Sequence, residues 1–145
     1  MKKAILLGAM VCALGMMTAC NGLFRHDVFD VVKHTFNNGS DTIDFNESLW
    51  FEWDTMYWFP SKYSLEEVNS IVNINSYWQD VGDRIVFVKG NRIVHYKEYF
   101  PYHETPLERI CFNSDSIQVT YREDALFSIQ RISNKLFVLN HVQKQ

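Results

Sequence analysis

The alternation of apolar and polar side chains predicts that residues 50–60 form a β-strand. Successive strand residues point to opposite faces of a sheet. One face would carry Phe51, Trp53, Thr55, Tyr57 and Phe59. The other would carry Trp50, Glu52, Asp54, Met56 and Trp58. We expect the first face to lie in the core, and the mixed second face to be covered by a helix or used for binding. Pro60 lacks a backbone N–H and should end the strand.

Two stretches carry apolar residues at helical spacing. The first is residues 23–38, which should end at Asn37-Asn38-Gly39 because Asn and Gly tolerate the left-handed conformation of a helix end. The second is residues 64–72, where Ser64 and Glu67 have the spacing of a capping box. We therefore expect two short amphipathic helices.

Clusters of β-branched and aromatic residues between turn residues predict further strands. Residues 84–89 and 92–99 are separated by Gly90-Asn91, which is typical of a two-residue β-hairpin with positive φ in the turn. Other strands are expected at residues 42–45, 109–112 and 116–121, and in a final hairpin of residues 125–132 and 136–142. The pattern thus predicts one α+β domain, with an antiparallel sheet of about six strands and two helices packed on one face.

The first 19 residues have the composition of a bacterial secretory signal peptide. Lys2 and Lys3 precede an apolar run that is too short for a membrane span of about 20 residues. The sequence Met17-Thr18-Ala19-Cys20 resembles the lipobox, in which the cysteine is acylated. We therefore expect a signal peptide at residues 1–19 and a domain at residues 20–145, anchored through Cys20 to the cell membrane or outer membrane on the periplasmic side. An ordinary signal peptide with an incidental cysteine is the alternative.

Charge and cysteine content restrict the partners of the mature chain. Loss of Lys2 and Lys3 reduces the 14 basic residues to 12, against 17 acidic residues, so the net charge becomes −5. This balance argues against nucleic acid and against an electrostatic attraction to anionic lipid. With Cys12 removed and Cys20 acylated, Cys111 cannot form an internal disulfide, and we expect it to be a small buried hydrophobic residue.

The patterns of catalytic residues are sparse. Glu52 and Asp54 lie two positions apart on one strand face, within about 7 Å, beside tryptophans that could stack on a sugar. A small envelope glycan-binding protein or hydrolase that uses these two carboxylates is therefore an alternative function. Glycosidase carboxylates, however, usually come from separate elements that flank a cleft. The histidines lack zinc-type spacing and no nucleophile motif is found, so we expect no enzyme, cofactor or metal site.

The number of aromatic residues exceeds what a core of this size needs. Tyr and Trp are favoured at interfaces because they combine a large contact area with a polar group. The predicted binding residues are Trp50, Glu52, Asp54, Trp58, Tyr77 and Trp78. The leading hypothesis is a non-enzymatic envelope protein that binds another protein, in envelope maintenance or in neutralising a toxin. A purely structural lipoprotein is the remaining alternative.

Three features of the chain together resemble a loose group of small, functionally uncharacterised bacterial lipoproteins. They are the strand Trp53-Asp54-Thr55-Met56-Tyr57-Trp58-Phe59, the capped helix that follows it, and the hairpin around Gly90-Asn91 with its Phe87-Val88-Lys89 segment. The group shares a Trp-Asp-x-x-Tyr-x-Phe strand, a helix and a Phe-Val-Lys hairpin, and the resemblance covers roughly residues 40–142. It implies an envelope location and an α+β fold, and it implies no catalytic residue.

Overall fold

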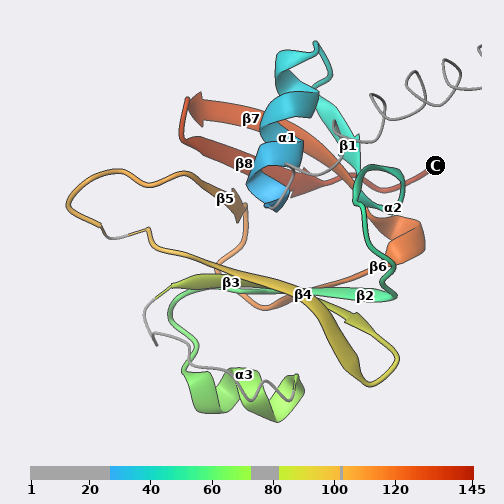
Figure 1. Ribbon diagram of the computed structural model, residues 1–145, viewed down its shortest axis with the longest axis vertical. Helices are drawn as coiled ribbons and strands as arrows, with labels where there is room; N and C mark the ends of the chain where they lie inside the picture. The colour runs from blue at the N-terminus through green and yellow to red at the C-terminus, as the bar shows by residue number, and fades with distance from the viewer. Residues whose placement is uncertain (1–26, 73–81, 102) are drawn as a thin grey trace, which may run out of the picture.

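The computed structural model describes residues 27–72, 82–101 and 103–145, which form two four-stranded sheets and three α-helices (Figure 1). The elements in chain order are α1 (Val28–Asn37), β1 (Thr42–Asp44), α2 (Phe45–Ser48), β2 (Thr55–Phe59), α3 (Leu65–Ile71), β3 (Asp83–Lys89), β4 (Arg92–Tyr99), β5 (Arg109–Phe112), β6 (Gln118–Tyr121), the 3₁₀ turn η2 (Arg122–Asp124), β7 (Leu126–Ser133) and β8 (Leu136–His141). Sheet A has the strand order β1-β7-β8-β5, and sheet B has the order β4-β3-β2-β6.

The prediction of a mixed α+β fold is confirmed, but the prediction of a single antiparallel sheet is wrong. β5 and β6 are neighbours in the sequence and join different sheets. β5 pairs with β8 in parallel, and β6 pairs with β2 in antiparallel orientation. The pairing partner of a short strand depends on contacts between residues far apart in the chain, so the local alternation could not reveal it.

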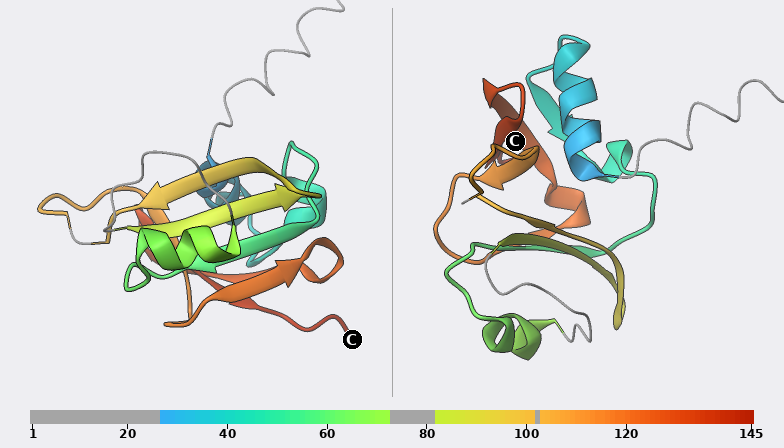
Figure 2. Two further views of the ribbon diagram at one scale, coloured as in Figure 1. Left: turned by 90° about the horizontal axis from the view of Figure 1, so that it is seen from below. Right: turned by 60° about the vertical axis from the view of Figure 1, so that its left-hand side comes forward.

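The helices lie on different sheets, so their predicted packing on one face is also wrong. α1 packs against sheet A, where Phe29 and Phe36 each place a ring centroid 5.7 Å from that of Phe137. α3 lies on the face of sheet B that points away from sheet A (Figure 2). Its Val68 and Val72 form a small second core with Phe59 and Val86 of sheet B.

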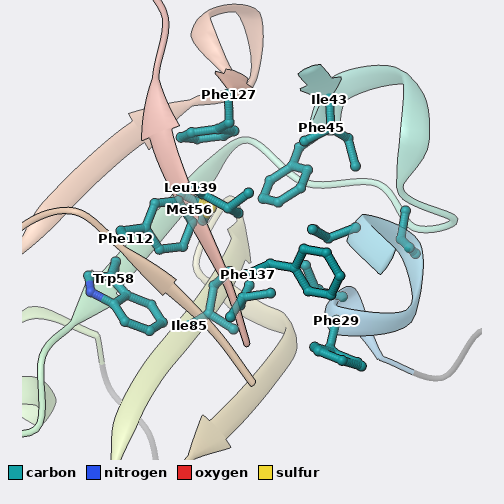
Figure 3. Packing of buried hydrophobic residues seen from close by; sticks show 14 of the residues in the cluster. Phe29, Ile43, Phe45, Met56, Trp58, Ile85, Phe112, Phe127, Phe137 and Leu139 are labelled. Carbon is teal, nitrogen blue, oxygen red and sulfur yellow. The ribbon is translucent and has the colours of Figure 1, made fainter. Parts of the chain in front are cut away.

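The main core lies between the two sheets and α1 (Figure 3). Aromatic rings join the layers: Trp58 of sheet B lies 4.9 Å from Phe112 of sheet A, measured between ring centroids. Phe45 of α2 bridges them, with its ring centroid 5.0 Å from that of Phe127 in sheet A and 6.3 Å from that of Phe87 in sheet B. These contacts hold the two sheets together.

Strand β2 begins at Thr55, later than predicted. The face expected in the core is buried, with Trp53 in the main core and Phe59 in the small core under α3. The other face is buried as well, because Met56 and Trp58 lie in the main core between the sheets. β2 lies between β3 and β6 and is covered on both sides, by sheet A and by α3. A strand buried on both faces cannot be oriented from apolar alternation alone.

Several local predictions are confirmed. α1 ends at Asn37 and is followed by Gly39 with φ of 93°. α3 carries both hydrogen bonds of the capping box between Ser64 and Glu67. The β3–β4 hairpin turns at Gly90, with φ of 58°, and β7 and β8 form the final hairpin. α2 was not predicted, because its single turn of four residues is too short to show a helical period.

Candidate functional site

The six predicted binding residues do not form one surface. Trp50, Glu52 and Asp54 are exposed on the segment that leads into β2. Trp58 is 1% exposed, so the prediction that it contacts a partner is wrong. Tyr77, Trp78 and the lipidation residue Cys20 lie outside the described residues.

Glu52 is held by basic residues of the same chain. Its Oε2 accepts a hydrogen bond from Arg122 Nη1 at 2.6 Å and lies 3.9 Å from Lys89 Nζ. The hydrogen bond and the positive charge of Arg122 lower the pKa of the Glu52 carboxyl. A glycosidase acid needs the opposite shift, because it must carry a proton at the start of the reaction. Glu52 is therefore suited to an ion pair and not to acid catalysis.

Asp54 fixes the tip of the β3–β4 hairpin. Its Oδ2 accepts a hydrogen bond from the Gly90 backbone N–H at 2.8 Å. Its own backbone N–H donates to the Val88 carbonyl at 2.8 Å, and its carbonyl accepts from the Arg122 N–H at 3.0 Å. These three bonds give Asp54 a structural role, and together with the ion pair of Glu52 they leave the hydrolase hypothesis without support from the geometry.

Apolar side chains are exposed on the face of sheet B that carries α3. Four of the large hydrophobic residues with high exposure lie on α3 or on this face: Ile71 (45%), Tyr96 (48%), Val119 (50%) and Tyr121 (56%). The strand register aligns Tyr121, Thr55, Val88 and Ile93 in one row across the sheet, close to the tip of the hairpin. The exposed apolar groups therefore continue across the sheet from β6 to β4.

A groove of about 370 Å³ runs beside this row, between the end of α3 and the hairpin. It is lined by Tyr57, Ile71, Val72, Val88, Gly90, Asn91 and Ile93. We call the groove, together with the exposed residues Glu52, Asp54 and Tyr121 at the same end of sheet B, the hairpin-end surface. Sequence reasoning identified its Glu52 and Asp54. It missed Tyr121, although Val119 and Tyr121 alternate with the buried Thr120 in the sequence of β6.

Trp50 belongs to an aromatic cluster on the other face of sheet B, where His95 is paired with the core residue Phe87. Its ring lies edge-on to Phe51 at 5.0 Å and to His95 at 5.3 Å between centroids. The Nε2 atom of His95 is buried and has no hydrogen-bond partner within the described part of the chain. Burial lowers the pKa of His95, which favours the neutral imidazole. The cluster is therefore a packed apolar support for Trp50.

A buried ionic group ties the segment after β2 to sheet B. Arg84 is 0% exposed, and its Nη1 donates to the Tyr63 carbonyl at 2.9 Å. The neighbouring Asp83 accepts from the Ser61 N–H at 2.8 Å, while burial raises the pKa of its carboxyl. Both side chains bind backbone groups that lead into α3, so they position this helix over the sheet.

The described residues offer little for covalent or metal chemistry. They contain no group of three or more His, Cys, Asp or Glu side chains placed to hold a metal ion. Burial raises the pKa of the Cys111 thiol, so the thiolate that a cysteine nucleophile needs is disfavoured.

The described helices and the comparisons with known proteins add two findings. Over residues 27–72, 82–101 and 103–145, no helix has the length and apolar character that a membrane crossing requires. Comparisons of the chain with protein-family models, with curated proteins and with solved structures found no match.

Proposed function

We propose that the protein is a membrane-anchored bacterial lipoprotein that acts as a non-enzymatic protein-binding module of the cell envelope, and that it binds its partner through the hairpin-end surface. Envelope maintenance and neutralisation of an incoming toxin are the candidate roles. Both need contact with another protein and neither needs bond cleavage by this chain.

The observation that carries the proposal is the exposure of Ile71 at the groove and of Val119 and Tyr121 on the same face of sheet B. Apolar surface in water is unfavourable by about 25 cal/mol per Å², and contiguous exposed apolar patches are typical of interaction sites. Charged residues lie beside these apolar groups, since Lys89 follows Val88 in the hairpin and Arg122 follows Tyr121, and both pair with Glu52. Apolar contacts with charged residues at their edge are the usual composition of a protein interface.

The membrane anchor is supported by the lipobox around Cys20 and by the resemblance to small bacterial lipoproteins. Several acyl chains on one residue hold a protein firmly at a bilayer, because each buried CH₂ contributes about 0.8 kcal/mol. Cys20 lies seven positions before Asp27, where the described part begins. An extended chain spans at most about 3.5 Å per residue, so the domain would stay within about 25 Å of the bilayer.

Affinity purification from solubilised membranes tests the proposal. The double variant Ile71→Ser/Tyr121→Ser should lose the partner that the wild-type protein recovers, after chemical crosslinking in intact cells. Ile132→Ser is the matched control, because Ile132 is 55% exposed on β7 of sheet A. Equal recovery by all three proteins, or no partner above background with the wild type, would contradict the proposal.

A further inference from the structure

A second and larger cavity of about 590 Å³ opens between the start of α1, the end of β4 and the β7–β8 turn. Its lining combines charged and apolar side chains: Asp27, Lys97, Glu98, Tyr99, Phe100, Pro106, Leu107, Glu108 and Lys135. None of these residues belongs to the hairpin-end surface, and the protein-docking function makes no use of them.

Two ammonium groups line this cavity. Lys97 Nζ lies 3.3 Å from Asp27 Oδ2, and its side chain is 47% exposed. Lys135 Nζ donates to the Pro106 carbonyl at 3.1 Å. A lysine ammonium has three N–H donors, so each group retains donors for a bound anion beyond the bond described here. Both lysines line the cavity, so each can donate to a phosphate bound within it.

Carboxylates also line the cavity, on Asp27, Glu98 and Glu108. Glu108 pairs with Lys33 at 3.1 Å, and its side chain is 51% exposed. The pKa of the nearby Asp30 is raised by burial and also by the negative charges of Asp27 and Glu108. The second carboxylate oxygen of Glu108, Oε2, can accept from a ligand ammonium while Oε1 stays paired with Lys33.

An apolar rim completes the site. Phe100, Pro106 and Leu107 line the cavity, and Leu107 is 39% exposed. This rim adjoins the carboxylates and lysines, so a ligand with a charged head and an apolar body matches the lining. A fully charged ligand would leave the rim unused.

We propose that this cavity binds the headgroup of a zwitterionic membrane phospholipid with a primary ammonium, such as phosphatidylethanolamine. The phosphate would lie between Lys97 and Lys135, the ammonium would face Glu108, and the acyl chains would leave over Leu107. Asp27 lines the cavity and is also where the segment from Cys20 enters the domain. The inference rests on the proposed lipid anchor for access to a bilayer. The net charge of −5 disfavours an anionic lipid in its place.

A titration of the purified mature protein with dihexanoyl-phosphatidylethanolamine tests this site. Backbone amide shifts of Leu107, Glu108 and Lys135 should move together and saturate. Dihexanoyl-phosphatidylglycerol, which lacks the ammonium, and dihexanoyl-phosphatidylcholine, whose ammonium has no N–H donor, should bind at least fivefold more weakly. O-Phosphoethanolamine separates a lipid from a free headgroup, and it should bind more weakly because it cannot use the apolar rim.

Matched variants locate the binding within the protein. Lys135→Gln and Glu108→Gln should each weaken binding by about tenfold or more, the size expected for one charge-assisted hydrogen bond. The controls Lys62→Gln and Glu66→Gln change exposed residues near α3 and should leave the affinity unchanged. Three results would overturn the proposal. They are equal affinity for the three lipids, an affinity for O-phosphoethanolamine equal to that for the phosphatidylethanolamine, and an affinity that neither cavity variant changes. The short-chain lipid is soluble without a bilayer, so this titration does not depend on the lipid anchor. A negative result would therefore refute lipid binding in the cavity alone; the anchor and the protein-docking surface are tested by their own experiments.

Discussion

Alanine replacement should separate the roles of Trp58 and Trp50, which the sequence places on one face of a strand. Trp58 is 1% exposed and packs on Phe112, whereas Trp50 is 48% exposed. A buried aromatic side chain removes about 150–250 Å² from water. At about 25 cal/mol per Å², and in line with measured substitutions of this type, Trp58→Ala should lower the free energy of unfolding by about 3–5 kcal/mol.

The same change at Trp50 should have a much smaller effect. About half of its surface already lies in water, and its contacts are with the rings of Phe51 and His95. We expect Trp50→Ala to lower the free energy of unfolding by about 1.5–2.5 kcal/mol, half of the loss at Trp58, from the same area relation. The two variants should therefore differ by about 2 kcal/mol.

Urea unfolding followed by far-UV circular dichroism measures both values. The slope of the free energy of unfolding against urea concentration should be the same in all variants, so that a shift of the midpoint reports stability alone. Trp58→Phe is the companion variant in case Trp58→Ala does not fold, and it should lose less stability because an aromatic ring remains beside Phe112. Equal losses at the two positions, or a larger loss at Trp50, would refute the placement of Trp58 in the core.

Three further changes test local features. Gly90→Ala should destabilise the hairpin by about 1–2 kcal/mol, because φ of 58° is costly for a residue with Cβ; faster amide exchange in β3 and β4 would show it, and unchanged exchange would contradict it. Tyr99→Phe removes the 2.6 Å hydrogen bond to Asp27 Oδ1 and should lower the urea midpoint by an amount equivalent to about 1.5–3 kcal/mol; an unchanged midpoint would count against this bond. Burial lowers the pKa of His95 in the folded state, so its stabilising contribution is complete above the unfolded pKa of about 6.5 and is lost as pH falls through the lower folded value. His95→Phe should therefore reduce the loss of stability between pH 7.5 and pH 5.5, and an identical pH dependence in both proteins would show that His95 is not its source.

Local structure was predictable where a few neighbouring residues determine it. The capping box of α3 needs only Ser64 and Glu67, and the β3–β4 turn needs only Gly90-Asn91. The pairing of strands was not predictable in the same way. The alternation in β5 is the same whether it pairs with β6 or with β8, and the choice depends on which distant apolar face it covers.

The same limit applies to the candidate site. The sequence identified Trp50, Glu52 and Asp54 as surface residues near one strand, and the structure exposes all three. It could not reveal that Asp54 bonds to Gly90, or that Tyr121 lies in the same row as Val88, because these contacts join different strands. Trp58 is buried because sheet A covers that face of β2, and the local alternation of apolar residues does not reveal which sheet covers a strand.

Photo-crosslinking from the hairpin-end surface in intact cells tests the docking function most directly. A photoreactive phenylalanine analogue would replace Tyr121 or Ile71 in separate variants, and Ile132 on sheet A in a control. We predict that Tyr121 and Ile71 crosslink to the same envelope protein, identified by mass spectrometry, and that Ile132 does not. Crosslinks to no protein, or to the same protein with equal yield from all three positions, would contradict a partner-binding role for this surface.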